Sequence, residues 1–358
     1  NTDPSATITS DVVWENDGVV TVTWTASDAT SGINTCTLTV AGQTHNCAAG
    51  DGTADFTVAD GVDYTANIAI TDVAGNSGSS NTDTFSMDNT DPSATITSDV
   101  VWENDGVVTV TWTASDATSG INTCTLTLSH ATEDDQTADC SDGNGSADFT
   151  VADGTDYTAN IAIADVAGNT GSSNTDTFSA DNTDPAAAIT SDVTWDTDGT
   201  VTVTWTASDG GSGIDTCTVS VSDSQTANCA GGAGSADFAM NDGSGYTVSI
   251  SIADVAGNTG SSNTDTFGVD TTDPSAAITS DLTWDTDGSV TVTWTASDAT
   301  SGINTCTLTM SDGQTADCAS GDGSASFDMD DGSGYTANIA IADIAGNTGS
   351  SNTDTFGV

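Results

Sequence analysis

The chain has 358 residues, of which 53 are Asp or Glu, two are His and none is Lys or Arg, so its formal net charge is −53. It therefore has no basic patch for nucleic acid, phosphate or anionic lipid, no lysine nucleophile and no arginine clamp. Each carboxylate must be solvated, hydrogen-bonded, protonated or paired with a dissolved cation.

The composition favours a folded β protein. Hydrophobic residues make up 35% of the chain, which also contains 37 Gly and eight Trp. Thr is abundant and prefers strands, and the apolar residues recur in fixed patterns, unlike those of a disordered acidic chain. No apolar run approaches the roughly 20 residues of a membrane span, so we expect no membrane insertion. No signal peptide is visible.

The chain consists of four repeats. The segment Asn1–Thr39 recurs unchanged at Asn89–Thr127, and related copies begin at Asn182 and Thr271. The predicted domains are residues 1–88, 89–181, 182–270 and 271–358. A period of roughly 90 residues suits one small domain and is too long for a solenoid unit. Both ends of the chain fall at repeat junctions, so we interpret it as an excerpt of a longer array.

Within the first repeat, apolar residues alternate with polar ones, mostly Thr, in a series of short segments. In chain order the segments are 6–8, 13–14, 20–26, 36–40, 54–58, 64–70 and 85–87. Alternation places one face of each strand in a core and the other in water, as antiparallel sheets allow. About seven such strands separated by Gly, Asp, Asn and Ser turns predict an all-β immunoglobulin-like sandwich in each repeat.

Two kinds of aromatic residue recur in these patterns. One Tyr per repeat, at positions 64, 157, 246 and 335, stands where a tyrosine corner begins strand F of an immunoglobulin-like domain. The two Trp of each repeat are predicted to be core residues.

The run YTANIAIADVAGNTGSSNTDTF at Tyr157–Phe178, followed by the junction Thr183–Pro185, resembles the bacterial immunoglobulin-like repeats of large surface adhesins. The resemblance extends over all four repeats. It departs from the usual pattern in its Asp-Pro junction and in its lack of Lys and Arg. The resemblance implies extension modules of a surface or secreted protein, often stiffened by calcium.

Each repeat contains two cysteines that flank a polar, Gly-rich loop. The pairs are Cys36/Cys47, Cys124/Cys140, Cys217/Cys229 and Cys306/Cys318. We predict one disulfide per repeat, which implies an oxidising and therefore extracellular location, at the cell surface or secreted. Zinc is the alternative, but no His recurs with the cysteines, because His45 and His130 are isolated.

Acidic and amide residues are expected to meet where one domain joins the next. In an immunoglobulin-like sandwich the N-terminus, the B–C loop and the F–G loop share one end, and the last Asp of the previous domain can join them. Such oxygen clusters suit calcium, although Asp and Asn also form ordinary turns. The candidate ligands, in repeat order, are Asp3, Asp28, Asp72 and Asn76; Asp88, Asp91, Asp116, Asp165 and Asn169; Asp181, Asp184, Asp209, Asp254 and Asn258; and Asp270, Asp273, Asp298, Asp343 and Asn347. Asp17 and Asp60 could approach the same junction from the other side.

Several functions remain open at this level. Near-identical copies suit a spacer of an extracellular adhesin or stalk, whose partners are the neighbouring repeats of its own chain. The alternative is a segment of a polymeric filament, in which copies of the chain join one another. Glycan or ice binding by the outward Thr face of Thr21, Thr23 and Thr25 is a weaker alternative, because sandwich sheets twist. We expect no enzymatic activity and no catalytic residue, since every candidate Asp pair recurs with the repeats.

Overall fold

The computed structural model describes residues 2–281, 283 and 286–358, and it contains four β-sandwiches. The chain divides into two compact units, Asn1–Asn182 and Thr183–Val358, and each unit contains two of the sandwiches. None of the described residues form a helix that is long and apolar enough to span a membrane. The predicted all-β class is confirmed, while the exact repeat boundaries stay a prediction.

The described residues of the first sandwich form nine strands. They are β1 (Ser5–Ile8), β2 (Trp14–Glu15), β3 (Val19–Ser27), β4 (Ile33–Val40), β5 (Gln43–Asn46), β6 (Gly52–Thr57), β7 (Gly61–Asp72), β8 (Ser77–Ser79) and β9 (Asp83–Met87).

The second and third sandwiches repeat this order, and the described residues of the fourth form eight strands. The second has β10 (Ser93–Ile96), β11 (Trp102–Glu103), β12 (Val107–Ser115), β13 (Ile121–His130), β14 (Glu133–Asp139), β15 (Gly145–Thr150), β16 (Gly154–Asp165), β17 (Thr170–Ser172) and β18 (Asp176–Ala180). The third has β19 (Ala186–Ile189), β20 (Trp195–Asp196), β21 (Thr200–Ser208), β22 (Ile214–Val221), β23 (Thr226–Asn228), β24 (Gly234–Ala239), β25 (Gly243–Asp254), β26 (Thr259–Ser261) and β27 (Asp265–Val269). The fourth has β28 (Ser275–Ile278), β29 (Ser289–Ser297), β30 (Ile303–Met310), β31 (Thr315–Asp317), β32 (Gly323–Asp328), β33 (Ser333–Asp343), β34 (Thr348–Ser350) and β35 (Asp354–Gly357).

Each sandwich pairs a three-stranded sheet with a larger one. In the first, β1, β3 and β6 form the small antiparallel sheet, and the large sheet runs β2-β9-β7-β4-β5, with β8 added to β7. The short strand β2 pairs parallel to β9, whereas the other neighbours are antiparallel. The same order recurs in the second and third sandwiches. The edges of the large sheet are therefore β2 and β5, and those of the small sheet are β1 and β6.

The core of each sandwich comes from the alternation in its strands. Along β3 the residues Val20, Val22, Trp24 and Ala26 are buried, while the Thr residues between them are half-buried or exposed. The described residues of each repeat form a hydrophobic cluster of their own. Each sandwich thus buries its own apolar faces, as an independent domain does.

The two Trp of a repeat have different environments. Trp24, Trp112, Trp205 and Trp294 are buried in the cores, as predicted. The prediction is only partly right for the second Trp, because Trp14, Trp102 and Trp195 are half-buried on the edge strand of the large sheet. The remaining one, Trp284, lies outside the described residues. The edge position explains the difference, since an edge strand is covered on fewer sides.

The tyrosine corner is present at the start of the long third strand of the large sheet. The hydroxyl groups of Tyr157, Tyr246 and Tyr335 donate to the backbone carbonyl five residues upstream, at O···O distances of 3.0, 3.2 and 3.2 Å. This bond confirms the immunoglobulin-like corner at these three positions.

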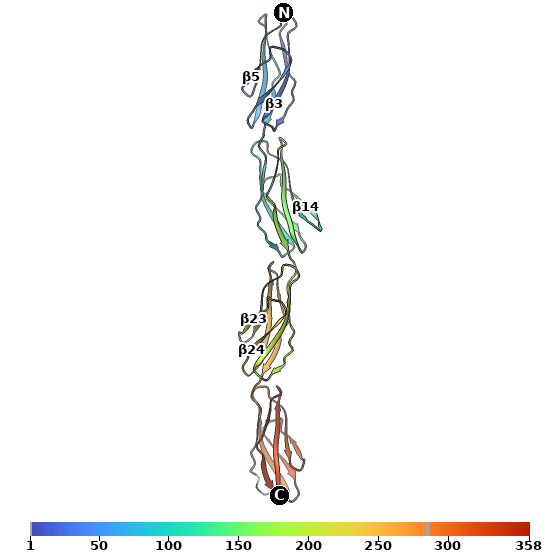
Figure 1. Ribbon diagram of the computed structural model, residues 1–358, viewed down its shortest axis with the longest axis vertical. Coiled ribbons are helices and arrows are strands. Elements are labelled where there is room, and N and C mark those ends of the chain that lie inside the picture. The colour runs from blue at the N-terminus through green and yellow to red at the C-terminus, as the bar shows by residue number, and fades with distance from the viewer. Residues whose placement is uncertain (1, 282, 284–285) are drawn as a thin grey trace. The chain divides into compact units, whose positions relative to one another are not determined.

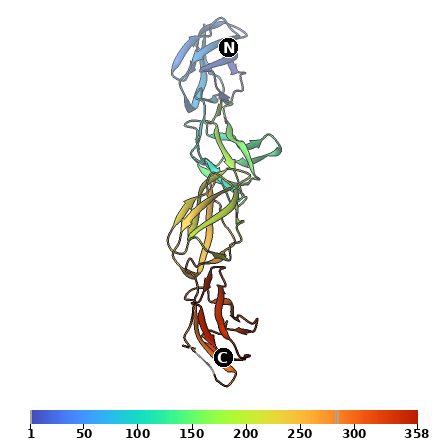
Figure 2. The same ribbon diagram turned by 60° about the horizontal axis from the view of Figure 1, so that its bottom comes forward.

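The second sandwich has the longest hairpin beside its cysteines. Strands β13 and β14 extend beyond their counterparts and project from the sandwich (green in Figures 1 and 2). His130 on this hairpin stacks on Tyr157, with ring centroids 4.3 Å apart, and Glu133 accepts a hydrogen bond from the Tyr157 hydroxyl at 2.7 Å. Burial and the Glu133 carboxylate raise the pKa of Tyr157 to about 12. The insertion thus covers a tyrosine that is half-buried in the other repeats.

Candidate metal centre

The F–G turn of the second sandwich is organised around a buried carboxylate. Asp165 ends β16, and its Oδ1 accepts the backbone N–H groups of Gly168 and Asn169 at 2.6 and 2.8 Å. Its Oδ2 accepts the side-chain amide of Asn169 at 2.8 Å. Gly168 has a φ of +100°, a conformation that favours glycine. The Asp-Val-Ala-Gly-Asn sequence therefore forms a tight loop with its carboxylate turned inwards.

The B–C loop of the same sandwich contributes a second carboxylate. Oδ2 of Asp116 accepts the backbone N–H groups of Thr118 and Gly120, at 3.0 and 2.7 Å. Its Oδ1 is buried and has no hydrogen-bond partner among the described residues. The equivalent oxygens of Asp28, Asp209 and Asp298 are in the same situation. A buried carboxylate oxygen without a donor is costly unless a cation or a proton satisfies it.

A third carboxylate comes from the preceding sandwich. Asp88 directly follows β9, and its backbone N–H donates to the carbonyl of Glu15 at 2.9 Å. It is fully buried. Its Oδ2 accepts the N–H of Ser119 at 2.9 Å, and its backbone carbonyl accepts the Asn169 side-chain amide at 2.7 Å. The end of the first sandwich is therefore bonded to both loops of the second.

These three carboxylates form a compact cluster. One oxygen from each of Asp88, Asp116 and Asp165 lies within 4.8 Å of the others. At an effective dielectric constant of 20, two unit charges at that distance repel by roughly 3 kcal/mol. This repulsion exceeds the net contribution that a single hydrogen bond usually makes to stability. The chain has no Lys or Arg to offset this repulsion. The arrangement can therefore hold a metal ion that prefers oxygen ligands.

The junction between the third and fourth sandwiches is built in the same way. Asp270, Asp298 and Asp343 also bring one oxygen each within 4.8 Å. Oδ2 of Asp270 accepts the N–H of Ser301 at 3.0 Å, and its carbonyl accepts the side-chain amide of Asn347 at 2.7 Å. The cluster thus recurs in both compact units with the same hydrogen bonds.

The third sandwich has the same loops. Asp254 accepts the N–H groups of Gly257 and Asn258 at 2.7 and 2.9 Å, and Asp209 accepts that of Gly213 at 2.7 Å. Two further ligands were predicted for this site. Asp184 lies in the second compact unit, as Asp209 and Asp254 do, whereas Asp181 lies in the first unit. A metal site here stays a prediction.

The first sandwich differs in how its loops are bonded. Asp28 accepts the N–H groups of Gly32, Thr30 and Ser31, which hold the pKa of its carboxyl below the ordinary value. Burial acts to raise the pKa of Asp72, but hydrogen bonds from the side chain and backbone of Asn76 outweigh it and lower this pKa. In both residues the hydrogen bonds favour the ionised form of the carboxyl group.

Not every predicted ligand joins a cluster. The Asp residue directly before the proline of each repeat is exposed; these residues are Asp3, Asp91, Asp184 and Asp273. Asp91 and Asp273 are not part of the two carboxylate clusters described above. Asn169 and Asn347 direct their amide nitrogens at an Asp carbonyl and an Asp carboxylate, and their predicted role as ligands stays a prediction. They position the carboxylates by hydrogen bonding.

Asp60, which the sequence predicts to approach the junction, accepts hydrogen bonds from the linker residues Asn89 and Thr90. Its oxygens accept the backbone N–H of Asn89 at 2.9 Å and the hydroxyl of Thr90 at 2.6 Å. The Thr90 hydroxyl and the Asn89 N–H lower the pKa of the Asp60 carboxyl. Asp242 accepts the corresponding bonds from Thr272 and Thr271, with its pKa lowered for the same reasons. These residues anchor the segment that carries Asp88 or Asp270.

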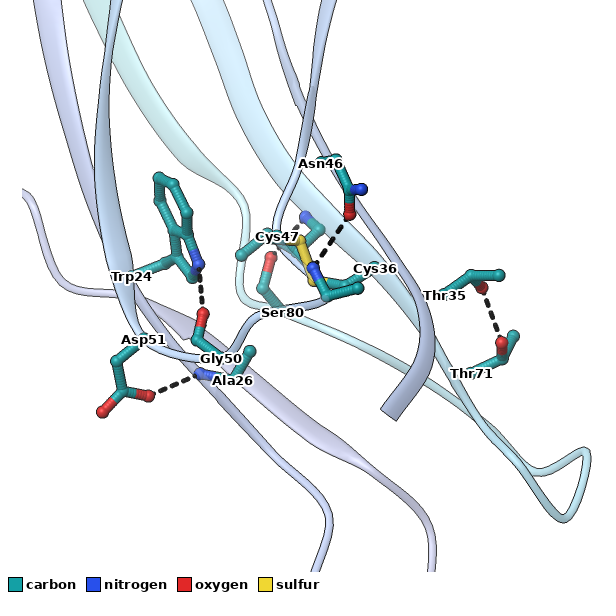
Figure 3. The surroundings of a disulfide bond; sticks show 12 residues. Trp24, Ala26, Thr35, Cys36, Asn46, Cys47, Gly50, Asp51, Thr71 and Ser80 are labelled. Atoms are coloured by element: carbon teal, nitrogen blue, oxygen red, sulfur yellow. Dashed lines mark hydrogen bonds between the residues drawn. A yellow bond between two sulfur atoms is a disulfide. The ribbon is translucent and has the colours of Figure 1, made fainter. Parts of the chain in front are cut away.

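The cysteines are bonded within each sandwich. The disulfides are Cys36–Cys47, Cys124–Cys140, Cys217–Cys229 and Cys306–Cys318. Figure 3 shows the first of them beside Trp24, whose indole N–H donates to the carbonyl of Gly50 at 2.9 Å. Cys36 lies on β4 and Cys47 directly follows β5, so the first bond joins the edge strand of the large sheet to the neighbouring strand of the same hairpin.

The outward Thr face of the small sheet is largely bonded to itself. Thr21 donates to Asp55 at 2.8 Å, and the hydroxyls of Thr9 and Thr23 lie 2.9 Å apart. This arrangement satisfies side-chain hydroxyls on an exposed β surface.

No protein-family model matches the chain, and no curated protein matches it. Among solved structures it is similar to the chicken CNTN1 FN1–FN3 domains, with 14% identity and a TM-score of 0.28 over 75% of this chain and 98% of that one. It is also similar to fibronectin(III)-like modules of CbhA from Clostridium thermocellum, with 16% identity and a TM-score of 0.27 over 49% and 93% of the two chains. The BSP domain of a biofilm associated protein has 12% identity and a TM-score of 0.21 over 99% and 96%.

Proposed function

We propose that the chain is a non-enzymatic spacer of an extracellular adhesin or cell-surface stalk, in which calcium stiffens the junctions between sandwiches. The observation that supports it most is the recurrence of one carboxylate cluster, Asp88–Asp116–Asp165 and Asp270–Asp298–Asp343, at a junction in each unit. Because each cluster takes one ligand from one sandwich and two from the next, a bound cation would restrain the hinge between them.

Calcium is the cation that this ligand set favours. It takes six to eight oxygen ligands in flexible geometry, whereas magnesium demands near-ideal octahedral geometry and keeps several waters. Three carboxylates on three different loops, together with backbone carbonyls and water, can supply such a set. The unpartnered Oδ1 atoms of Asp116 and Asp298 give each cluster an oxygen that is free to bind the ion.

The disulfides support the extracellular location. The bonds found in each of the four sandwiches form and persist in oxidising environments such as the cell exterior. The absence of Lys and Arg from the sequence also removes the cleavage sites of trypsin-like proteases, an advantage for an exposed spacer.

Electron microscopy of the full chain in calcium and after chelation tests this proposal. We expect single particles whose end-to-end distances are narrowly distributed in calcium and broaden after chelation. The Asp116→Asn/Asp298→Asn variant should show the broad distribution in both buffers. Distances that are unchanged by chelation would contradict calcium stiffening, and ordered fibres many chains long would favour a polymeric filament over a spacer.

A further inference from the structure

We propose that Asn144 of the second sandwich is an acceptor for an N-linked glycan. It begins the sequence Asn144-Gly145-Ser146, which fits the Asn-x-Ser/Thr acceptor pattern of secreted proteins. The inference requires the export that the proposed function assumes, but it depends neither on calcium binding nor on a spacer role.

The local structure presents the reactive atom of Asn144 to solvent. Oδ1 of Asn144 accepts the backbone N–H of Ala114 at 3.1 Å, which fixes the orientation of the side chain. Asn144 is exposed, and its Nδ2 makes no hydrogen bond to any of the described residues. The amide is thus held by its oxygen while its nitrogen, the atom that a glycan would join, faces outwards.

The other two residues of the pattern fit the same interpretation. Gly145 is exposed, but a Cβ atom there would come 3.0 Å from the ring of Trp112, so a side chain at this position would point towards that ring. Ser146 lies on β15, the edge strand of the small sheet, where it is exposed and pairs with Thr111 of β12. Asn144 is exposed in the bend directly before β15, two residues from the exposed Ser146.

The other repeats show that the acceptor is not a requirement of the fold. At the position of Asn144 the first and fourth repeats have Asp51 and Asp322, whose Oδ1 atoms accept the same backbone bond, from Ala26 at 2.9 Å and Ala296 at 3.1 Å. Figure 3 shows this bond for Asp51. The third repeat has Ala233 there. Since Asp serves equally well as the acceptor of this hydrogen bond, the amide nitrogen is what distinguishes the second repeat.

The modification itself is a simple group transfer. Nδ2 of Asn144 would form a bond to the anomeric carbon of a sugar carried on a lipid-linked diphosphate. The bond from that carbon to the diphosphate oxygen would break, the diphosphate would leave, and Nδ2 would lose one proton. The glycan would stand between β14 and β15, the two sheet edges on this side of the sandwich. A glycan that covers these two edge strands would hinder their pairing with a strand of another chain.

The direct test is mass spectrometry of the chain isolated from its native source. Trypsin cannot cleave it, so an Asp- and Glu-directed protease should be used to release the peptide that contains Asn144. We expect this peptide to carry the added mass of a glycan on Asn144. A peptide that is unmodified, or only deamidated, would overturn the proposal.

Variants of the full chain, secreted from cells with an asparagine-glycosylation apparatus, test the geometry. We expect one glycan on the unaltered chain, none on Asn144→Asp or Ser146→Ala, and two on Asp322→Asn, which gains the pattern in the fourth repeat. Asn144→Asp should melt at an unchanged temperature, since Asp51 and Asp322 make the same bond. A glycan that persists in Ser146→Ala, or an unaltered chain without one, would contradict the assignment.

Discussion

The first and second sandwiches begin with the same sequence, Asn1–Thr39 and Asn89–Thr127, yet their loops are bonded differently. In the first, the N–H of Ser31 donates to Asp28 at 2.6 Å. In the second, the equivalent N–H of Ser119 donates to Asp88 of the preceding sandwich at 2.9 Å. The same loop sequence thus directs this N–H group to different carboxylates. In the second sandwich the carboxylate cluster includes a residue of the preceding sandwich.

Removing a disulfide tests whether the two sandwiches are equivalent away from the junction. The cysteines are separated by 11 residues in the first and 16 in the second. We expect Cys36→Ala/Cys47→Ala and Cys124→Ala/Cys140→Ala each to lower the free energy of unfolding of its sandwich by about 3 kcal/mol in the chain-entropy model. Calorimetry of the full chain measures this. Markedly unequal losses would mean that the two sandwiches differ beyond the junction.

Replacing one carboxylate of the Asp88–Asp116–Asp165 cluster should change the free energy of unfolding in opposite directions with and without calcium. A carboxylate outside such a cluster should not show this reversal. In chelator, Asp116→Asn removes one of three clustered charges and should raise the free energy of unfolding by about 1–2 kcal/mol. In calcium the same variant loses a ligand and should be less stable than the unaltered chain. Thermal unfolding in both buffers measures the two differences.

The matched variant is Asp28→Asn, at the same position of the same sequence. It weakens hydrogen bonds from Thr30, Ser31 and Gly32 to a charged acceptor. We expect a small loss of stability with the same sign in both buffers. A reversal of sign for Asp28→Asn as well would show that the first sandwich binds calcium without a third carboxylate.

Acid should weaken the anchor of the linker that carries Asp88. The pKa of Asp60 is lower in the folded chain than in the unfolded one, so its contribution is complete above the ordinary pKa of about 3.9 and is lost as the pH falls through the folded pKa. In chelator, Asp60→Ala should therefore lose less stability than the unaltered chain when the pH is lowered from about 5 to about 2.

The control is Asp134→Ala, which removes an exposed carboxylate of β14 that makes no hydrogen bond to the described residues. Its pH dependence should follow that of the unaltered chain. If Asp60→Ala and Asp134→Ala respond alike, the bonds from Asn89 and Thr90 contribute nothing specific to stability.

Strands with a buried face could be predicted from the sequence, and strands without one could not. The alternation of Val20, Val22 and Trp24 predicted β3, and the corresponding patterns predicted the other core strands. Strand β5 (Gln43–Asn46) is exposed at every residue, and β8 (Ser77–Ser79) has no apolar residue at all. Both strands are fixed by backbone hydrogen bonds to a single neighbouring strand, which leave no hydrophobic period in the sequence.

The candidate site was predictable in composition but not in detail. The topology of the sandwich placed Asp88, Asp116 and Asp165 at one end, and they cluster there. The exposure of Asp91 and the donor role of Asn169 depend on side-chain directions within turns, which residue type alone does not determine. The hydrogen bond from the Ser119 N–H to Asp88 has no signal in the sequence, because every residue except proline carries a backbone donor.

Calcium titration of the full chain by calorimetry tests the central claim most directly. The unaltered chain, Asp28→Asn, Asp116→Asn and Asp298→Asn would be compared after exhaustive chelation. We predict that Asp116→Asn and Asp298→Asn each lose one equivalent of bound calcium, while Asp28→Asn loses none. Equal losses in all three variants would show that each repeat binds calcium on its own, and no binding to the unaltered chain would contradict the junction centres altogether.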